Sequence, residues 1–152
     1  MLNPDYRDIL SAFTVENVEY LLVGAYALAA HGFVRATGDI DLWTRPSEEN
    51  AERVIRALAR FGAPLSEVSV ADFTEPGIVF QLGVAPRRID ILTMIDGVSF
   101  EEAWQERKQI EVDGLPVPVI SRSHLAKNKE SVGRPQDLVD LDWLRGQGEG
   151  EG

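Results

Sequence analysis

The 152-residue sequence contains no cysteine and only two histidines, His31 and His124. The absence of thiols excludes disulfide bonds, thiolate metal sites and covalent thiol chemistry. Two histidines without any cysteine also argue against a zinc site. His31 stands next to a glycine at the expected end of a helix, where a histidine is more often a packing or helix-dipole residue than a base, so we assign it no catalytic role.

Long apolar runs are missing as well. No stretch approaches the roughly 20 apolar residues of a membrane helix, and residues 1–6 lack the basic and apolar segments of a signal peptide. We therefore expect a cytoplasmic protein with no membrane partner. Basic residues are few, 15 against 25 acidic ones for a net charge of −10, which argues against broad nucleic-acid binding. A locally basic cleft could still hold a nucleotide or an RNA end.

The composition is that of a globular chain, with 44% hydrophobic and 26% charged residues. A chain of this size can bury one continuous core. We expect a single domain over residues 1–145. The glycine-rich, low-complexity tail at 146–152 is predicted to be disordered.

Apolar periodicity, β-branched runs and turn residues predict an alternation of helices and strands. Strands are expected at 19–24, 40–44, 78–84, 87–93, 108–112 and 115–120, and helices at 5–17, 25–31, 49–61, 99–107, 121–132 and 135–145. The segment 63–77 is expected to be a loop. The strands at 78–84 and 87–93 should pair as a hairpin, and Asp113-Gly114 should turn a second one. Its two prolines predict that the strand at 115–120 lies at a sheet edge.

Three aspartates alternate with aliphatic residues on two of these strands. In Asp39-Ile40-Asp41-Leu42 the strand period of two places both carboxylates on one face, about 6 to 7 Å apart. In Arg88-Ile89-Asp90-Ile91 the same alternation turns Asp90 away from the isoleucines. A neighbouring strand could therefore deliver a third carboxylate to the same place.

Carboxylates about 6 Å apart repel each other by roughly 2 to 3 kcal/mol at an effective dielectric constant near 20, and a cation would remove that cost. Carboxylate oxygens suit magnesium, and one or two magnesium ions would fit phosphoryl-group chemistry. An isolated D-x-D pattern is more often a polar strand surface. Here a strand, a glycine turn and a helix precede it, and backbone N–H groups at such a helix start can bind phosphate.

The run LLVGAYALAAHGFVRATGDIDLW resembles the N-terminal signature of the polymerase-beta-like nucleotidyltransferase superfamily, and VISRSHLAKNKESVGRPQDLVDLDWL resembles the C-terminal signature of its small members. The minimal nucleotidyltransferases and AbiEii-type toxin proteins are the most similar groups. The resemblance spans residues 20–144 with gaps. It implies an α/β (α+β) nucleotidyltransferase fold: a small mixed, mostly antiparallel sheet with flanking helices and two C-terminal helices.

The resemblance also implies residue roles. Asp39 and Asp41 would ligate magnesium, and Asp90 would complete the site and is a candidate to accept the proton of the attacking hydroxyl. Gly24 and Ala25 would bring the backbone close to the triphosphate. The family usually has Gly-Gly or Gly-Ser at this turn; alanine keeps its N–H but supplies no hydroxyl and resists positive φ.

Lys129 is the candidate phosphate contact on the C-terminal helices. It lies four residues after Leu125 and shares its inward-looking face, whereas Lys127 points away. It also matches the family's lysine in this motif, although a solvated or snorkelling lysine is the alternative. Asp137, at the start of the last helix, is interpreted as a structural residue that the helix dipole stabilises.

Arg35 and Thr37, in the loop before Asp39, are candidates to contact the triphosphate or the acceptor, with simple surface charge as the alternative for the arginine. Trp43 shares the strand face of Asp39 and Asp41. It is therefore a candidate platform for stacking a base, although tryptophans are more often core residues.

We expect a magnesium-dependent nucleotidyltransferase that uses an NTP and an acceptor hydroxyl on an RNA 3′ end such as that of tRNA, on a protein or on a small molecule. A partner protein or a homodimer could supply the acceptor site, and a toxin–antitoxin or abortive-infection context is an open possibility. The alternative is a non-catalytic nucleotide-binding or partner-binding regulatory module of the same fold, which Gly24-Ala25 favours and the aspartate triad opposes.

Overall fold

The computed structural model describes residues 2–33, 38–84 and 87–148. The helices are α1 (Pro4–Val15), α2 (Gly24–Ala30), α3 (Glu48–Phe61), α4 (Phe100–Gln105), α5 (Arg122–Val132) and α6 (Pro135–Gly148). The strands are β1 (Tyr20–Val23), β2 (Ile40–Thr44), β3 (Val79–Leu82), β4 (Ile89–Leu92), β5 (Lys108–Val112) and β6 (Leu115–Val119). Every predicted helix and strand is present. The predicted loop at 63–77 contains one 3-10 turn, Val70–Phe73, which Phe73 anchors in the core.

The strands form one mixed sheet in the order β3-β4-β2-β1-β6-β5. The pairs β1–β6 and β2–β4 are parallel, and the other three pairs are antiparallel. The two predicted hairpins, β3–β4 and β5–β6, are both present. The predicted fold class, a small mixed and mostly antiparallel sheet with flanking helices, is therefore confirmed.

The predicted edge position of β6 is wrong, because β6 lies between β1 and β5. Its pairing with β1 occurs at its C-terminal end, where Leu22 lies opposite Val119 and the Ile120 N–H donates to the Leu22 carbonyl oxygen over 3.2 Å. Backbone N–H groups two residues apart on a strand point to the same neighbouring strand, so Pro116 and Pro118 would point theirs toward β1, as Ile120 does. Along most of β6 this side has no register partner in β1, so the missing N–H groups cost few hydrogen bonds. The edge strand is β5.

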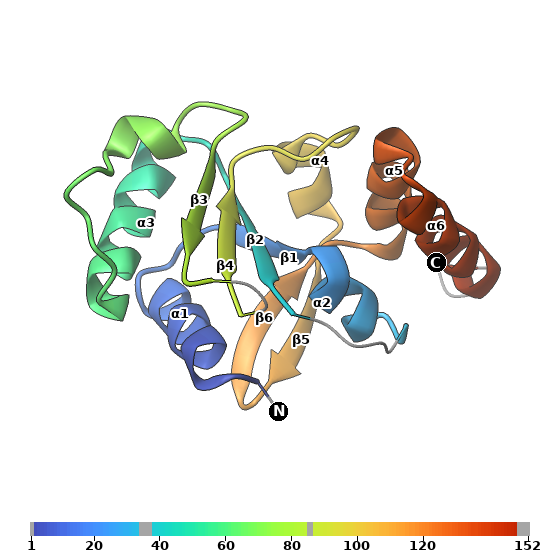
Figure 1. The fold of residues 1–152 in the computed structure, drawn as a ribbon, viewed down its shortest axis with the longest axis horizontal. Helices are drawn as coiled ribbons and strands as arrows, with labels where there is room; N and C mark the ends of the chain where they lie inside the picture. Colours follow the sequence, from blue (N-terminus) through green and yellow to red (C-terminus); the bar gives the residue numbers. More distant parts are fainter. Residues whose placement is uncertain (1, 34–37, 85–86, 149–152) are drawn as a thin grey trace.

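Helices cover the sheet on both sides in the view of Figure 1. There α1 and α3 lie together on one side of the strands, and α2 and α4 lie on the other, with the α5–α6 pair beyond them. All four residues of β1 are buried, as the double cover requires. No helix in the described part of the chain combines the length and apolarity that crossing a membrane requires.

The helix boundaries follow the expected signals. Ser47 caps α3 by accepting a hydrogen bond from the Asn50 N–H, and Gly133 ends α5 with a positive φ of 68°. Pro135 then opens α6. This helix continues to Gly148, three residues into the segment predicted to be disordered, and residues 149–152 lie outside the described part of the chain.

Candidate active site

The pairing of β2 with β4 places Asp41 directly beside Asp90. The two strands are parallel, and Asp41 is the register partner of Asp90. Paired residues on adjacent strands project to the same face, and Asp39 lies two residues before Asp41 on that face. The fold therefore brings together the three aspartates that the sequence singled out, from segments about 50 residues apart (Asp41 and Asp90 are separated by 49 positions).

Arg88 connects two of the three carboxylates. Its Nε and Nη2 donate to the two carboxylate oxygens of Asp90 over 2.6 and 3.1 Å, which is a bidentate ion pair. The same Nη2 lies 3.3 Å from Asp39 Oδ2, and the Arg88 backbone N–H donates to Asp39 Oδ1 over 2.8 Å. Asp39 and Asp90 are thus held by one cation.

Asp41 lies outside this ion pair, although Arg88 and Lys129 are both close enough to stabilise its charge. Burial, followed by repulsion from Asp90 and then from Asp39, raises the pKa of Asp41 from 3.8 to about 7, and the two cations only partly oppose this. The cluster is therefore short of positive charge.

Gly24 packs against Asp41 where β1 turns into α2. Its φ is +71°, and a Cβ atom at this position would lie 3.0 Å from Asp41 Cγ and would overlap Oδ2. Both facts require glycine. Ala25 follows in the first turn of α2, so the predicted strand, glycine turn and helix are present beside the carboxylates.

Tyr6 is a positioning residue that the sequence did not reveal. Its hydroxyl donates to the Gly38 carbonyl oxygen over 2.7 Å and lies 3.3 Å from the Arg88 carbonyl oxygen. Burial and then the neighbouring Tyr26 and Asp39 raise the pKa of Tyr6 to about 12, so the hydroxyl stays protonated. It ties α1 to the residues directly before Asp39 and Ile89. These bonds link positions 32 and 82 residues apart, which no local pattern reports.

The role of Arg88, in contrast, can be predicted from the sequence. Arg88 precedes Asp90 by two residues, and the strand period of two places both side chains on one face. A cation next to a predicted carboxylate cluster on the same strand face is a natural partner for it.

Lys129 faces inward as predicted, while Lys127 is exposed. The Lys129 Nζ lies 3.2 Å from Asp137 Oδ1 and 3.1 Å from Asp140 Oδ2, and both carboxylates are buried. Arg134 adds a bidentate contact to Asp137. The structure thus gives Lys129 a role in joining α5 to α6 and agrees with the structural interpretation of Asp137; a phosphate contact by Lys129 stays a prediction.

Trp43 does not supply a stacking platform, and this prediction is wrong. The side chain is 1% exposed, and its ring meets that of Phe100 edge-on at 5.1 Å. Asp41 is partly buried, and two residues later Phe100 of α4 covers the same face of the sheet at Trp43. Arg35 and Thr37, the predicted triphosphate or acceptor contacts, lie outside the described residues.

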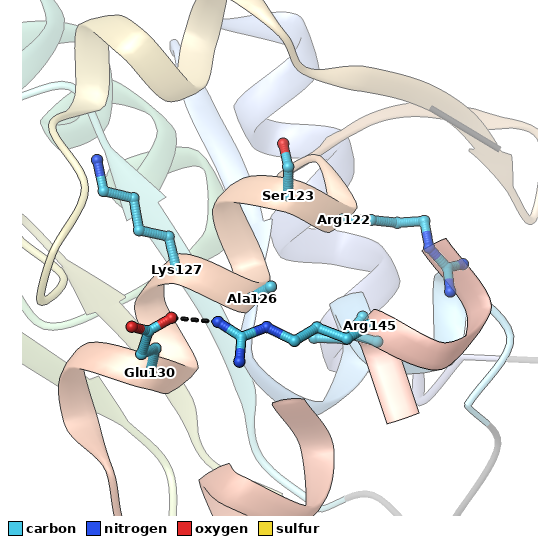
Figure 2. Close-up of a pocket in the computed structure, with 7 residues that line it drawn as sticks. Arg122, Ser123, Ala126, Lys127, Glu130 and Arg145 are labelled. Carbon is cyan, nitrogen blue, oxygen red and sulfur yellow. Dashed lines mark hydrogen bonds and ion pairs between the residues drawn. The ribbon is translucent and has the colours of Figure 1, made fainter. Parts of the chain in front are cut away.

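The cavity shown in Figure 2 lies between α5 and α6 and is separate from the aspartates. Its volume is about 350 Å³, and its charged lining residues are Arg122, Lys127, Glu130 and Arg145. These cations have partners: Arg145 pairs with Glu130, Lys127 lies 3.5 Å from Glu102, and Arg122 donates to the His31 carbonyl oxygen over 2.9 Å. None of the three aspartates lines this cavity.

The donor chemistry of the acidic site fits a hard divalent cation, because three carboxylates are the ligand type that magnesium prefers. In the structure, however, the Arg88 guanidinium contacts two of these three carboxylates. Within residues 2–33, 38–84 and 87–148, no group of three or more His, Asp or Glu side chains is arranged to hold a metal ion. The acidic site therefore has suitable donors, two of which are engaged by an arginine.

Comparison with known proteins gives likeness in structure only. No protein-family model matches the sequence, and neither does any curated protein. The fold resembles TM1012 of Thermotoga maritima, a candidate nucleotidyltransferase, with a TM-score of 0.63 and 21% identity over 95% of this chain and 96% of that one.

It also resembles the antibiotic-resistance factor ANT(2″)-Ia. The solution structure gives a TM-score of 0.60 and 16% identity over 97% of this chain and 84% of that one. The crystal structure with adenylyl-2″-tobramycin gives 0.58 and 15% over 96% and 88%. Together with the sheet order and the helices around it, these likenesses show that the chain has the nucleotidyltransferase fold.

Proposed function

We propose that the protein transfers a nucleoside monophosphate from an NTP to an acceptor hydroxyl in a magnesium-dependent reaction. The observation that supports this most directly is the pairing of Asp41 with Asp90 across parallel strands, with Asp39 on the same face and Gly24 packed against Asp41. Such a cluster has a deficit of positive charge on a fold that nucleotidyltransferases use.

The proposed division of labour assigns Asp39 and Asp41 to magnesium, with Asp90 completing the site. When bound, magnesium supplies charge neutralisation at the phosphate oxygens. The acceptor oxygen attacks the α-phosphorus, the bond to the β-phosphate breaks, and pyrophosphate leaves. Asp90 accepts the proton of the attacking hydroxyl, while the backbone of Gly24, which has no side chain, and the N–H of Ala25 approach the triphosphate.

The acceptor could be an RNA 3′ end, a protein or a small molecule. ANT(2″)-Ia, which has a similar fold, forms a complex with adenylyl-2″-tobramycin. The sheet and its helices account for the described residues, and we propose a partner protein or a second copy as the source of the acceptor site. The finer resemblance to minimal nucleotidyltransferases and AbiEii-type toxins, and with it a toxin–antitoxin context, rests on the two sequence signatures.

A labelling experiment tests the proposal. Purified protein is incubated with α-labelled NTPs, magnesium and fractionated RNA, protein or small-molecule extract, and labelled products are resolved by class. Wild type should give a labelled product that disappears in the Asp39→Ala/Asp41→Ala variant. The matched control is Asp142→Ala, which removes an exposed aspartate of α6 and should leave labelling intact.

The second candidate is a non-catalytic nucleotide-binding or partner-binding module. It is favoured by Gly24-Ala25, which lacks a hydroxyl, and by the engagement of Lys129 with Asp137 and Asp140. NTP binding in a thermal-shift assay, with no labelled product from any extract fraction, would favour this module over the enzyme.

A further inference from the structure

Arg88 lies between two of the three aspartates of the acidic site. Its guanidinium contacts Asp90 with two nitrogens and Asp39 with one of the same two. The carboxylates that it joins are two of the three proposed magnesium ligands. A metal ion shared by Asp39 and Asp90 would compete with the guanidinium for the same oxygens.

We propose that the Arg88 guanidinium and a divalent cation are alternative partners of Asp39 and Asp90, so that Arg88 holds the site together in the metal-free protein and leaves both carboxylates when the metal binds. The inference rests on the proposed magnesium site. Competition from Arg88 would weaken binding of the free metal ion. It would also couple metal binding to movement of the Arg88 side chain.

The surroundings of Arg88 permit this exchange. Its side chain is 29% exposed, whereas Lys129, the buried cation of the α5–α6 pair, is 9% exposed. A partly exposed arginine can rotate into solvent without leaving a cavity in the core. The charges also favour the exchange: when the guanidinium leaves, three carboxylates face the divalent ion, which supplies two positive charges where Arg88 supplied one.

Arg134 is a matched internal control. Its Nε donates to Asp137 Oδ2 over 2.6 Å and its Nη2 to Oδ1 over 3.2 Å, nearly the geometry of Arg88 on Asp90. It belongs to the junction of α5 and α6 and contacts none of the three aspartates of the acidic site in any hydrogen bond or ion pair described above. Arg88→Gln and Arg134→Gln therefore remove the same charge and the same kind of ion pair.

The experiment measures Mn²⁺ affinity by electron paramagnetic resonance without nucleotide for wild type, Arg88→Gln, Arg88→Lys and Arg134→Gln. Removal of the competing cation should tighten binding at least about fivefold in Arg88→Gln. Arg88→Lys, which keeps the charge without the bidentate fork, should be intermediate, and Arg134→Gln should match wild type. In wild type, ¹H–¹⁵N spectra should show the Arg88 Nε–H signal shifting on addition of Mg²⁺ while the Arg134 signal stays fixed.

Equal or weaker Mn²⁺ binding in Arg88→Gln, with Mn²⁺ binding by wild type intact, overturns the exchange and leaves the proposed function standing. An unchanged Arg88 signal at saturating Mg²⁺ does the same and needs no variant to fold. If neither wild type nor Arg88→Gln binds Mn²⁺ in a manner that Asp41→Asn abolishes, the metal site itself fails, and the proposed function fails with it.

Discussion

Gly24 and Asp41 lie so close together that a Cβ atom on residue 24 would be 3.0 Å from Asp41 Cγ and would overlap Oδ2. Gly24→Ala should therefore displace Asp41 and also force alanine to a φ of +71°. We expect the free energy of unfolding to fall by about 2 kcal/mol, and Mn²⁺ affinity to fall at least about tenfold. Urea unfolding and Mn²⁺ titration measure the two effects.

Gly62→Ala is the control for the cost of placing alanine at a positive φ. Gly62 has a φ of +94°, and apart from the adjoining residues no heavy atom of the described chain lies within 4 Å of the position that its Cβ would take. This variant should lose about 1 kcal/mol of stability and keep its metal affinity. Equal Mn²⁺ affinity in Gly24→Ala and wild type would mean that the close approach to Asp41 has no functional consequence.

Local signals predicted the parts of the fold that local physics determines. The run Ile40–Thr44 was expected as a strand and is β2 residue for residue, and Ser47 caps the helix that follows it. Strand alternation correctly separated Asp41 from Ile40 and Leu42. These outcomes depend on side-chain periodicity and helix capping, which are determined by residues only a few positions apart in the sequence.

The prediction failed where distant segments decide. Strand alternation correctly placed Trp43 on the same face as Asp41. However, Phe100 at the start of α4 packs against the tryptophan and helps to bury it. The prolines of β6 suggested an edge, but β1 pairs at the end of that strand beyond them. Tyr6 reaches the acidic site only because α1 packs there. None of these contacts leaves a short-range trace in the sequence.

Asp41→Asn should stabilise the metal-free protein. The folded-state pKa of Asp41 is raised to about 7 from 3.8, so the folded state binds the proton more tightly and wild-type stability falls as the pH rises between these values. The variant lacks this loss. In EDTA its free energy of unfolding should exceed that of wild type by up to about 4 kcal/mol at pH 8 and nearly match it near pH 4, as measured by urea unfolding. Asp142→Asn, an exposed control, should change little at either pH. Equal stability of Asp41→Asn and wild type at pH 8 would contradict the repulsion.

Asp137→Asn should show the opposite dependence on pH. The hydrogen bond from Arg134, together with Lys129, lowers the pKa of Asp137 below 3.8, so its ionised form stabilises the fold. This stabilisation is complete above the unfolded-state pKa and is lost as the pH falls through the lowered folded-state value. We expect the variant to be about 2 kcal/mol less stable at pH 7, with the difference shrinking below about pH 4. A difference that stays constant from pH 3 to pH 7 would show that packing, rather than charge, accounts for it.

Lys129→Met should be strongly destabilising. It leaves the buried carboxylates of Asp137 and Asp140 without the ammonium group that lies 3.2 and 3.1 Å from them. Loss of one partner from a buried ion pair costs about 3 kcal/mol or more. Lys127→Met, two residues away on the exposed side of α5, should stay within about 0.5 kcal/mol of wild type. Thermal unfolding of the two variants measures the contrast directly, and equal melting temperatures would refute it.

The same pair of carboxylates allows the structural role of Lys129 to be separated from a phosphate contact. Lys129→Met/Asp140→Asn removes one negative charge together with the lysine, so it should recover part of the lost stability and remain folded. Nucleotide affinity of this double variant, measured by calorimetry beside an Asp140→Asn control, then reports on Lys129 alone. If Lys129 also binds phosphate, affinity should fall about tenfold relative to Asp140→Asn. Unchanged affinity would leave Lys129 with the single task of joining α5 to α6, because its ammonium group already has two buried partners.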